Sequence, residues 1–291
     1  MPTLLSIGHG YSARALGRRL VARGWRVVGT SRDAATAAGF GADATEGLVW
    51  PGGDIAPALA AATHLLTSVA PDAEGDPVLR DLGAALAQAR GIVWAGYLST
   101  TAVYGDHAGG WVDEATPPAP STRRGEWRVR AEDGWRDLAA RSGLPLHIFR
   151  LAGIYGPGRG PFAKVRDGTA RRIVKPGQVF SRIHVEDIAT VLEASIARPD
   201  PGAIYNVCDD DPAPPEAVIE EAARLLGLPV PPAVAWDEAG MTEMARSFYA
   251  ESKRVRNVRI KTDLGVRLRH PDYRAGLRAL LSAELAARTG S

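Results

Sequence analysis

The stretch Leu4-Leu5-Ser6-Ile7-Gly8-His9-Gly10-Tyr11-Ser12-Ala13 decides how the N-terminal half of this chain folds. Its first four residues predict a buried β-strand, and residues 13–23 predict a helix directly after the glycines. A strand, a G-x-G-x-x-A turn and a helix in this order are typical of a phosphate-binding unit, because glycines let a pyrophosphate approach the backbone and the helix N-terminus offers free N–H groups. We therefore expect nucleotide phosphates to meet Gly8, Gly10, Tyr11, Ser12 and Ala13.

Short apolar runs alternate with helical segments through the rest of the first 155 residues. The runs predict strands at residues 4–7, 26–29, 48–50, 64–68, 92–98 and 146–150. The main helices are predicted at residues 13–23, 76–89 and 124–141. This alternation is typical of parallel strands joined by crossover helices, so we predict an α/β fold with a Rossmann-type doubly wound parallel sheet.

The second half of the chain differs in composition, because its loops are rich in Gly and Pro. Apolar segments at residues 179–185 and 203–207 could add strands to the sheet, and helices are predicted at residues 215–226 and 272–287. We expect a dinucleotide-binding domain over residues 1–155, with residues 183–207 returning to its sheet. We expect a smaller C-terminal substrate lobe from residues 156–182 and 208–291.

The end of the second strand indicates which dinucleotide is bound. A Rossmann site that prefers NAD carries a carboxylate there for the ribose 2′-hydroxyl, but this chain has Thr30-Ser31-Arg32. Thr30 and Ser31 can donate hydrogen bonds to a 2′-phosphate and Arg32 can pair with it, which favours NADP over NAD. The alternative is that Arg32 is a solvated charge and Asp33 binds the ribose of NAD. The free motif position, His9, is expected at the solvent edge.

Composition excludes several classes of function. The formal charge is only +2, with 35 Lys plus Arg against 33 Asp plus Glu, so nucleic acid is not an expected partner. One cysteine, Cys208, allows no internal disulfide. There is no apolar run of membrane length and no signal sequence after Met1, so we expect a cytoplasmic protein that does not bind membranes. No His, Cys and carboxylate cluster has metal-ligand spacing, so no metal is expected.

Five segments in order along the chain resemble the extended short-chain dehydrogenase/reductases, the NAD(P)-dependent epimerase/dehydratase family. They are residues 98–105 (L-S-T-T-A-V-Y-G), 150–158 (R-L-A-G-I-Y-G-P-G), 183–189 (I-H-V-E-D-I-A), 205–207 (Y-N-V) and 252–265, which begins S-K-R-V and ends L-G. In that family the Ser or Thr four residues before the Tyr of V-Y-G is the catalytic hydroxyl. The resemblance therefore implies that Thr100 hydrogen-bonds a substrate oxygen near the nicotinamide ring.

The family's catalytic Tyr and Lys, four residues apart on the next helix, are replaced here by Arg124 and Arg128. A guanidinium has a pKa above 12, so Arg124 cannot move a proton near neutral pH as a phenol can. Arg128 could still hold the cofactor's ribose or pyrophosphate, and Arg124 could bind an anionic substrate or stabilise an oxyanion. The alternative for both is a solvated helix face with an Arg128–Glu132 pair.

Two further departures narrow the chemistry that the resemblance implies. The Asp-Glu pair of sugar-nucleotide dehydratases is Thr101-Ala102 here, and the Asn that touches nucleotide-sugars is Gly153. The chain is thus similar to the atypical branch that lacks the Tyr-Lys pair. Candidate proton-moving groups are Tyr104, Tyr155 and His184, and Arg182 could face a substrate phosphate or carboxylate.

Two functions follow as hypotheses. The first is an oxidoreductase or epimerase that exchanges hydride with NADP over Thr100, Arg124 and Arg128 and acts on a small anionic substrate. The second is a non-catalytic NADP(H)-binding redox sensor or regulatory protein, because the usual acid/base is missing. Family members often dimerise through two helices, so a homodimer that uses the helix from Arg124 is also expected.

Overall fold

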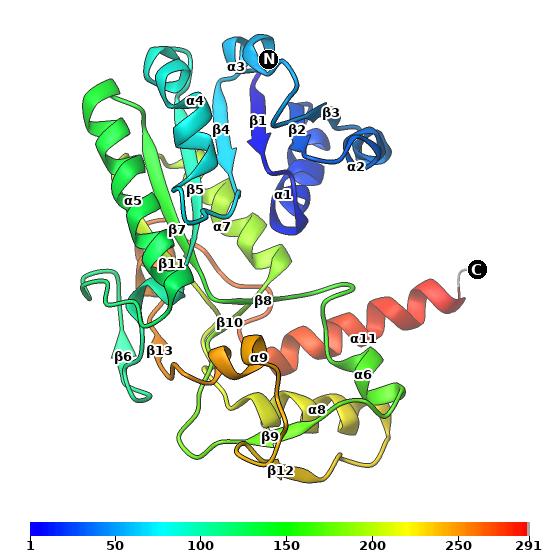
Figure 1. Ribbon diagram of the computed structural model, residues 1–291. Helices are drawn as coiled ribbons and strands as arrows, with labels where there is room; N and C mark the ends of the chain where they lie inside the picture. The colour runs from blue at the N-terminus through cyan, green and yellow to red at the C-terminus, as the bar shows by residue number, and fades with distance from the viewer. Residues whose placement is uncertain (290–291) are drawn as a thin grey trace.

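The core of the molecule is a seven-stranded, fully parallel sheet (Figure 1). The computed structural model describes residues 1–289. The strand order across the sheet is β3 (Glu46–Val49), β2 (Arg26–Ser31), β1 (Thr3–Ile7), β4 (His64–Thr67), β5 (Trp94–Thr100), β7 (Leu146–Leu151) and β11 (Ile204–Val207). This order confirms the predicted Rossmann-type doubly wound sheet. The strands β2 and β3 are added on one side of β1, and the later strands β4, β5, β7 and β11 are added on the other side. The point between β1 and β4 is therefore the topological switch point, and in such sheets ligands bind at the carboxyl ends of the strands at this point.

Helices cover both faces of the sheet, which is why its strands are apolar on both sides. On one face lie α1 (Tyr11–Val21) and α7 (Val185–Ala197), and on the other lie α3 (Ala56–Ala61), α4 (Pro77–Gln88) and α5 (Arg123–Ser142). Successive residues of β1 show the division, because Leu4 packs in the cluster with α1 and α7 whereas Leu5 packs in the cluster with α3, α4 and α5. The helices predicted from the sequence are confirmed with ends shifted by one or two residues.

The two helices beside the site begin and end with strong local signals. Asp76 caps α4 by accepting hydrogen bonds from the backbone N–H groups of Val78 and Leu79. Thr122 caps α5 by accepting from the N–H of Gly125, and Gly143, in the left-handed conformation at φ 73°, ends this helix. Arg124 and Arg128 are therefore fixed in the first two turns of α5.

A smaller lobe lies next to the carboxyl edge of the sheet, in the lower part of Figure 1. It contains α6 (Phe162–Arg166), β9 (Arg172–Val174), α8 (Pro215–Leu226), β12 (Ala233–Ala235), α9 (Glu243–Phe248) and α11 (Tyr273–Thr289). Phe162, Ala222 and Leu277 belong to a hydrophobic core of its own. Within residues 1–289, no helix is both long and apolar enough to cross a bilayer.

Two segments lie elsewhere than the sequence suggested. The strand predicted at residues 179–185 does not join the main sheet. A shorter strand, β10 (Arg182–His184), forms instead and pairs with β8 (Gly153–Tyr155), the short strand that follows β7. The expected lobe 208–291 is also interrupted. β13 (Arg254–Val255) pairs with β6 (Trp111–Val112), and α10 (Val258–Thr262) packs on β11 through Ile260. The strand predicted at residues 203–207 is confirmed as β11.

The remaining short elements connect these bodies. They are α2 (Ala34–Ala38), the 3-10 helix η1 (Gly39–Asp43) and the 3-10 helix η2 (Thr101–Tyr104). η2 begins directly after β5 and positions the V-Y-G segment under the carboxyl edge of the sheet.

A buried ion pair lies beneath that edge. Arg150 of β7 is 2% exposed and Glu132 of α5 is fully buried, and two hydrogen bonds of 2.7 and 3.1 Å join the guanidinium to the carboxylate. The Ser99 hydroxyl donates to the same carboxylate at 2.5 Å, and Arg150 also donates to the Tyr104 hydroxyl at 3.0 Å. Glu132 therefore does not form the expected pair with Arg128, because its side chain is turned into the core.

We predict that breaking this pair destabilises the protein strongly. Either Glu132→Ala or Arg150→Met is expected to lower the free energy of unfolding by about 3–5 kcal/mol, because each leaves a buried charge without a partner. The double variant Glu132→Leu with Arg150→Met is expected to recover much of that loss. Urea denaturation of the three variants measures this, and single-variant losses below about 1 kcal/mol would contradict it.

Candidate functional site

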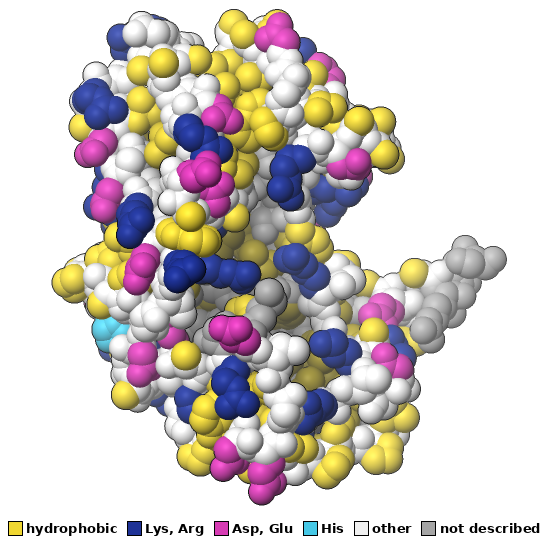
Figure 2. Space-filling view, viewed as in Figure 1, with side chains coloured by type: hydrophobic (Ala, Val, Ile, Leu, Met, Phe, Trp, Pro, Cys, Tyr) yellow, Lys and Arg dark blue, Asp and Glu magenta, His cyan; other side chains and the backbone are white. Residues whose placement is uncertain are grey.

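A cavity of about 690 Å³ lies beside the glycine turn, where the carboxyl ends of β1, β2 and β4 meet. Gly8 and Gly10 line one wall, Ser31 and Arg32 another, and the loop Ser68–Asp72 a third. Figure 2 shows this face of the molecule hollowed between the two lobes, with Lys and Arg side chains on both rims. Five of the predicted dinucleotide-binding residues thus line one cavity, namely Gly8, Gly10, Thr30, Ser31 and Arg32, whereas Tyr11, Ser12, Ala13 and Arg128 do not line it.

The glycine turn has the geometry that its sequence requires. Gly8 has φ +76°, and a Cβ atom there would come within 3.0 Å of Val69. Its N–H donates to the Thr30 hydroxyl at 2.9 Å. Gly10 lies at the N-cap of α1 with no side-chain cap, and a Cβ on it would meet only the Gly8 carbonyl at 3.9 Å. The approach to the helix N-terminus is therefore open, as a phosphate needs.

The other residues of the motif have packing roles as well. Ser12 and Ala13 are buried, and Ala13 belongs to the core under α1. Thr30 is buried too, so its hydroxyl braces the turn through Gly8. Among the three residues expected to meet a 2′-phosphate, only Ser31 and Arg32 remain accessible.

The expectation that His9 lies at the solvent edge is wrong. Its ring is 3% exposed and fills a space that Gly17 and Gly29 leave, since a Cβ on either glycine would come within 2.8 Å of it. Phe40 contacts the ring edge-on at 4.9 Å. Burial lowers the pKa of His9 to about 4, with Arg14 adding to the effect, so the ring is neutral at physiological pH.

The two residues after β2 have different environments. Asp33 caps α2: its carboxylate accepts from the N–H and the hydroxyl of Thr36 at 2.7 and 2.6 Å. Arg32 is exposed, lines the cavity, and has no ion-pair partner among the described residues. The carboxylate that could bind an NAD ribose is thus engaged elsewhere, and the guanidinium is free.

Tyr11 connects this crevice to the smaller lobe. Its hydroxyl donates to the Pro157 carbonyl at 2.9 Å, and the Arg159 guanidinium lies over its ring at 4.8 Å. The first turn of α1 therefore contacts the loop that follows β8.

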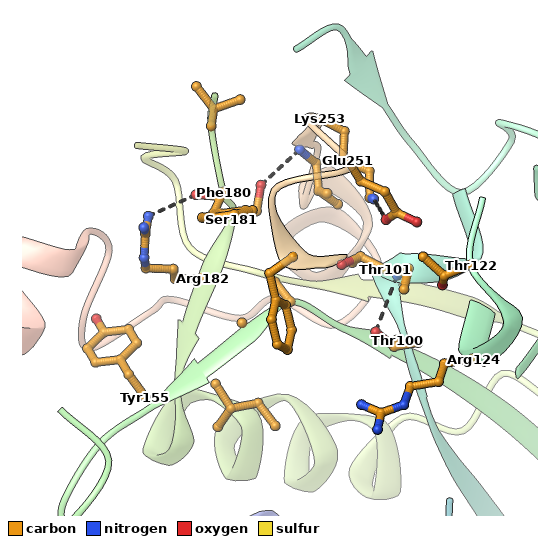
Figure 3. A pocket seen from close by; sticks show the side chains of 17 residues that line it. Thr100, Thr101, Thr122, Arg124, Tyr155, Phe180, Ser181, Arg182, Glu251 and Lys253 are labelled. Atoms are coloured by element: carbon orange, nitrogen blue, oxygen red, sulfur yellow. Dashed lines mark hydrogen bonds and ion pairs between the residues drawn. The ribbon is translucent and has the colours of Figure 1, made fainter. Parts of the chain in front are cut away.

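A second cavity, of about 630 Å³, lies farther along the carboxyl edge of the sheet, beyond the ends of β5 and β7. Figure 3 shows Thr100 and Arg124 at one end of it and Tyr155 and Arg182 at the other. The Thr100 hydroxyl accepts a hydrogen bond from the Ala102 N–H at 3.2 Å, which starts η2 and leaves its own proton to donate. Arg124 is exposed and has no ion-pair partner in the described part of the chain.

Arg128 lies between the two cavities. Its guanidinium donates to the Tyr97 hydroxyl at 2.8 Å and to the Leu98 carbonyl at 3.1 Å, and it reaches the Val69 carbonyl at 3.4 Å. It therefore occupies the sheet edge where a cofactor would pass from one cavity to the other, although it lines neither.

The proton-moving candidates differ in access. Tyr104 is fully buried, donates to Asn206 at 2.7 Å and accepts from Arg150, so it belongs to the structural network. Tyr155 lines the second cavity; burial raises the pKa of its phenol well above the usual range, so it stays protonated. Burial lowers the pKa of His184 to about 4, which keeps this ring neutral.

His184 also belongs to a cluster that sequence spacing did not reveal. Its ligand atoms and those of Asp187 and His270 all lie within 4.8 Å of one another, although His270 comes from a distant segment. Two of the ring nitrogens are already used: His184 Nδ1 accepts from the Glu186 N–H at 3.2 Å, and His270 Nδ1 contacts Asp187 at 2.9 Å. The buried Nε2 of His184 has no hydrogen-bond partner among the described residues. The two imidazole rings are 3.9 Å apart and tie the C-terminal segment to α7.

Lys253 and Glu251 are site residues that sequence analysis did not single out. Both line the second cavity and form a 2.6 Å ion pair. Lys253 also donates to the Gly105 carbonyl at 2.7 Å, so it braces the turn after the V-Y-G segment. The S-K-R-V segment, residues 252–255, resembles the family's C-terminal pattern, but this resemblance did not predict that the segment lines the second cavity.

Asp209 is a buried acid behind Arg182. It is 1% exposed and forms no ion pair with any described residue. Burial raises its pKa to about 8, against the opposing influence of Arg182. At neutral pH most molecules therefore keep this carboxyl protonated, and it does not cancel the charge of the guanidinium.

Comparisons with known proteins agree with this architecture. No protein-family model matches the chain. A functionally unknown conserved protein from Silicibacter pomeroyi is 61% identical, with 98% of this chain and 99% of that chain covered and a TM-score of 0.92. A Methylobacillus flagellatus protein assigned to the NAD-dependent epimerases/dehydratases is 27% identical over 97% of this chain and 98% of its own, with a TM-score of 0.69.

A more distant structure and one curated relative complete the comparison. A dTDP-glucose 4,6-dehydratase from Bacillus anthracis in complex with NAD has a TM-score of 0.77 at 15% identity, with 98% of this chain and 97% of that chain covered. Protein YeeZ of Escherichia coli K12 is 35% identical over 136 residues, which are 46% of this chain and 47% of that protein. The match thus spans about half of the curated relative.

We predict that replacing Asp209 stabilises the protein increasingly as pH rises. Between pH 4 and 8 the folded carboxyl keeps a proton that the unfolded one has lost, so its contribution to stability falls as pH rises toward its folded pKa of about 8. An amide does not titrate. The stability of Asp209→Asn relative to the parent should therefore increase with pH, by up to about 1.4 kcal/mol per unit.

Urea denaturation at pH 5, 6.5 and 8 measures this difference. Asp167→Asn is the control, because Asp167 is exposed and its hydrogen bonds to Thr169 lower its pKa, which keeps it ionised in both states over this range. A difference for Asp209→Asn as constant as that of the control would contradict the prediction.

Proposed function

This chain belongs to one family with the Silicibacter pomeroyi protein and has the fold of the NAD-dependent epimerases and dehydratases, and on this basis we propose that it is an NADP-dependent oxidoreductase or epimerase. It would represent the branch without the Tyr-Lys pair and would act on a small anionic substrate. The observation that carries the proposal is that each of two cavities along the carboxyl edge of the sheet contains an arginine without an ion-pair partner among the described residues, Arg32 beside the glycine turn and Arg124 beside Thr100.

The crevice fits a dinucleotide. The open backbone at Gly10 and the uncapped N-terminus of α1 suit a pyrophosphate, and the space between Ser31 and Arg32 suits a 2′-phosphate. Arg128, at the sheet edge between the cavities, would hold the ribose or phosphate that passes it. When bound, the nicotinamide ring would supply or accept a hydride.

The choice of NADP over NAD rests on the two residues after β2. Asp33 caps α2 with its carboxylate, whereas Arg32 faces the cavity without an ionic partner among the residues described. A guanidinium matches the oxygens of a phosphate in charge and geometry, and it gives no acceptor to a ribose hydroxyl. The same pair of residues therefore supports NADP and disfavours NAD.

The reacting end of the crevice can bind and polarise an anion. Thr100 has a hydroxyl proton to donate to a substrate oxygen, and Arg124 offers a permanent positive charge beside it. Together they would stabilise negative charge that develops on that oxygen. Arg124 cannot exchange a proton, so a proton would come from another group that lines the cavity, such as the protonated phenol of Tyr155 or the side chain of Lys253.

The replacement of the catalytic Tyr by Arg124 also supports a second candidate function, a redox sensor that binds NADP(H) without turnover. Such a protein needs the cofactor crevice but no acid/base group. Steady-state assays separate the two candidates, because only the first converts a substrate: an oxidoreductase consumes NADPH, and an epimerase converts its substrate to the epimer with no net change in the cofactor.

We predict that Arg32→Asp reverses the cofactor preference. Removal of a charge-assisted contact worth about 1.5–3 kcal/mol would weaken NADPH binding by about 10- to 100-fold. The new carboxylate would leave NADH binding equal or tighter. Fluorescence titration measures both affinities, with Arg171→Asp as a control of equal charge change on the exposed surface of the small lobe. Equal NADPH affinities of the parent and Arg32→Asp would contradict the NADP assignment.

We further predict that Arg124→Gln lowers kcat/KM for an anionic keto substrate by about 10- to 100-fold, because it removes charge stabilisation at the reacting oxygen. NADPH affinity should not change. The measurement is NADPH oxidation against a panel of keto acids and sugar derivatives. Arg123→Gln is the matched control, since this exposed neighbour does not line the cavity. Tight NADPH binding by the parent with no turnover across the panel would favour the sensor.

A further inference from the structure

A third cavity, of about 390 Å³, lies in the smaller lobe. It is an open pocket lined by the loop after β8, by α6, and by the sides of α8 and α11, with Val218 and Leu277 as apolar contacts. Three cationic side chains line it, and they come from three separate segments: Arg159 from the loop, Lys164 from α6 and Arg182 from β10. The fold thus gathers positive charge at one point of the lobe.

These three cations have no ion pair. Arg166, Arg172 and Arg274 of the same lobe each form one, with Glu284, Glu220 and Asp211 respectively. In contrast, none of the three cavity cations has a carboxylate within ion-pair distance in the described chain, and the exposed Arg171, outside the cavity, has none either. No salt bridge therefore offsets the positive charge that the three side chains bring to the cavity.

Arg182 is held in place without being neutralised. One of its terminal nitrogens donates to the carbonyls of Phe180 and Ala213, both at 2.9 Å. Burial lowers its pKa, which shows that the charge is partly removed from water without full compensation. The nearby acid, Asp209, is largely protonated at neutral pH. An anionic ligand would supply the missing compensation.

The cavity also contains hydrogen-bond donors. The phenols of Tyr155 and Tyr273 line it beside the guanidinium, and burial raises the pKa of both, so both keep their protons. Three cations and two phenols match a group with two negative charges and several acceptor oxygens better than a single carboxylate. This donor set is that expected for a phosphoryl group.

The third cavity adjoins the second one. Arg182 and Tyr155 line both, and Figure 3 places them at the end opposite Thr100 and Arg124, with the Arg182 guanidinium directed away from Thr100. A molecule anchored in the third cavity can therefore extend past Tyr155 toward the reacting end of the crevice.

We propose that Arg159, Lys164 and Arg182 form a phosphate-binding subsite, and that the substrate is a small phosphate monoester anchored there while its other end lies at Thr100. The inference rests on the proposed function for the reaction at Thr100. The subsite itself is separate from the cofactor crevice, so the two ideas can fail independently.

Isothermal titration of the NADPH-saturated protein with inorganic phosphate and with glycerol 3-phosphate tests the subsite. Both probes are expected to bind, and Lys164→Glu should weaken both at least about tenfold by placing a negative charge in the cavity. Arg171→Glu is the matched control: it is an exposed cation of the same lobe outside the cavity, and it should change affinity less than about twofold. Arg182→Gln should repeat the loss seen for Lys164→Glu.

The outcomes separate the two proposals. If NADPH does not bind, the proposed function fails, and the same titration without cofactor, in an Arg32→Asp background that removes the other phosphate contact, still tests the subsite. Equal losses in Lys164→Glu and Arg171→Glu, or no binding of either probe, would overturn the subsite. Binding of inorganic phosphate with exclusion of the ester would overturn its role in holding a substrate.

Discussion

The ion pair between Arg150 and Glu132 is the interaction on which the site depends. It lies inside the protein, joins β7 to α5, and connects through Ser99 and Tyr104 to the end of β5 and to η2. Thr100 directly follows Ser99, and Arg128 is one helical turn before Glu132. The buried charges therefore fix the relative positions of the strand end that carries Thr100 and the helix that carries Arg128, at the desolvation cost that any buried pair has.

The arginines of this protein differ in their partners. Some that join elements are paired, as Arg19 is with Glu186 and Glu193 between α1 and α7. Arg80 lines the first cavity and is paired as well. In contrast, Arg32, Arg124 and Arg182 line cavities and have no carboxylate within ion-pair distance among the described residues. Arg32 and Arg124 are exposed and keep their hydration, whereas Arg182 is partly removed from water, so an anionic ligand would compensate the charge of Arg182 most.

The features that could be predicted correctly have local signals. The turn at Gly8 and Gly10 between a strand and a helix, and the helix α8 (Pro215–Leu226), are each determined by residues a few positions apart. The cofactor role of Arg32 stays a prediction. Contacts between side chains of distant segments could not be predicted in this way. His9 is buried because Gly17 and Gly29 leave space for its ring. The Glu132 side chain points into the core because it forms an ion pair there with Arg150 of β7. The proposed phosphate subsite could not be predicted either, because Arg159, Lys164 and Arg182 come from three separate segments and line one cavity only in the folded lobe.

The arginine at position 124 removes a group that could exchange protons at the carboxyl edge of the sheet and puts a permanent positive charge there. A tyrosine there can lose and regain a proton, whereas a guanidinium keeps its charge at every physiological pH. In the proposed reaction its electrostatic contribution would therefore be constant, because it would favour an oxyanion equally before and after hydride transfer. Any proton needed must come from a group that stays protonated in the cavity, as Tyr155 does, or from the substrate itself. A substrate that already carries its negative charge suits this fixed field better than one that must be deprotonated by the protein.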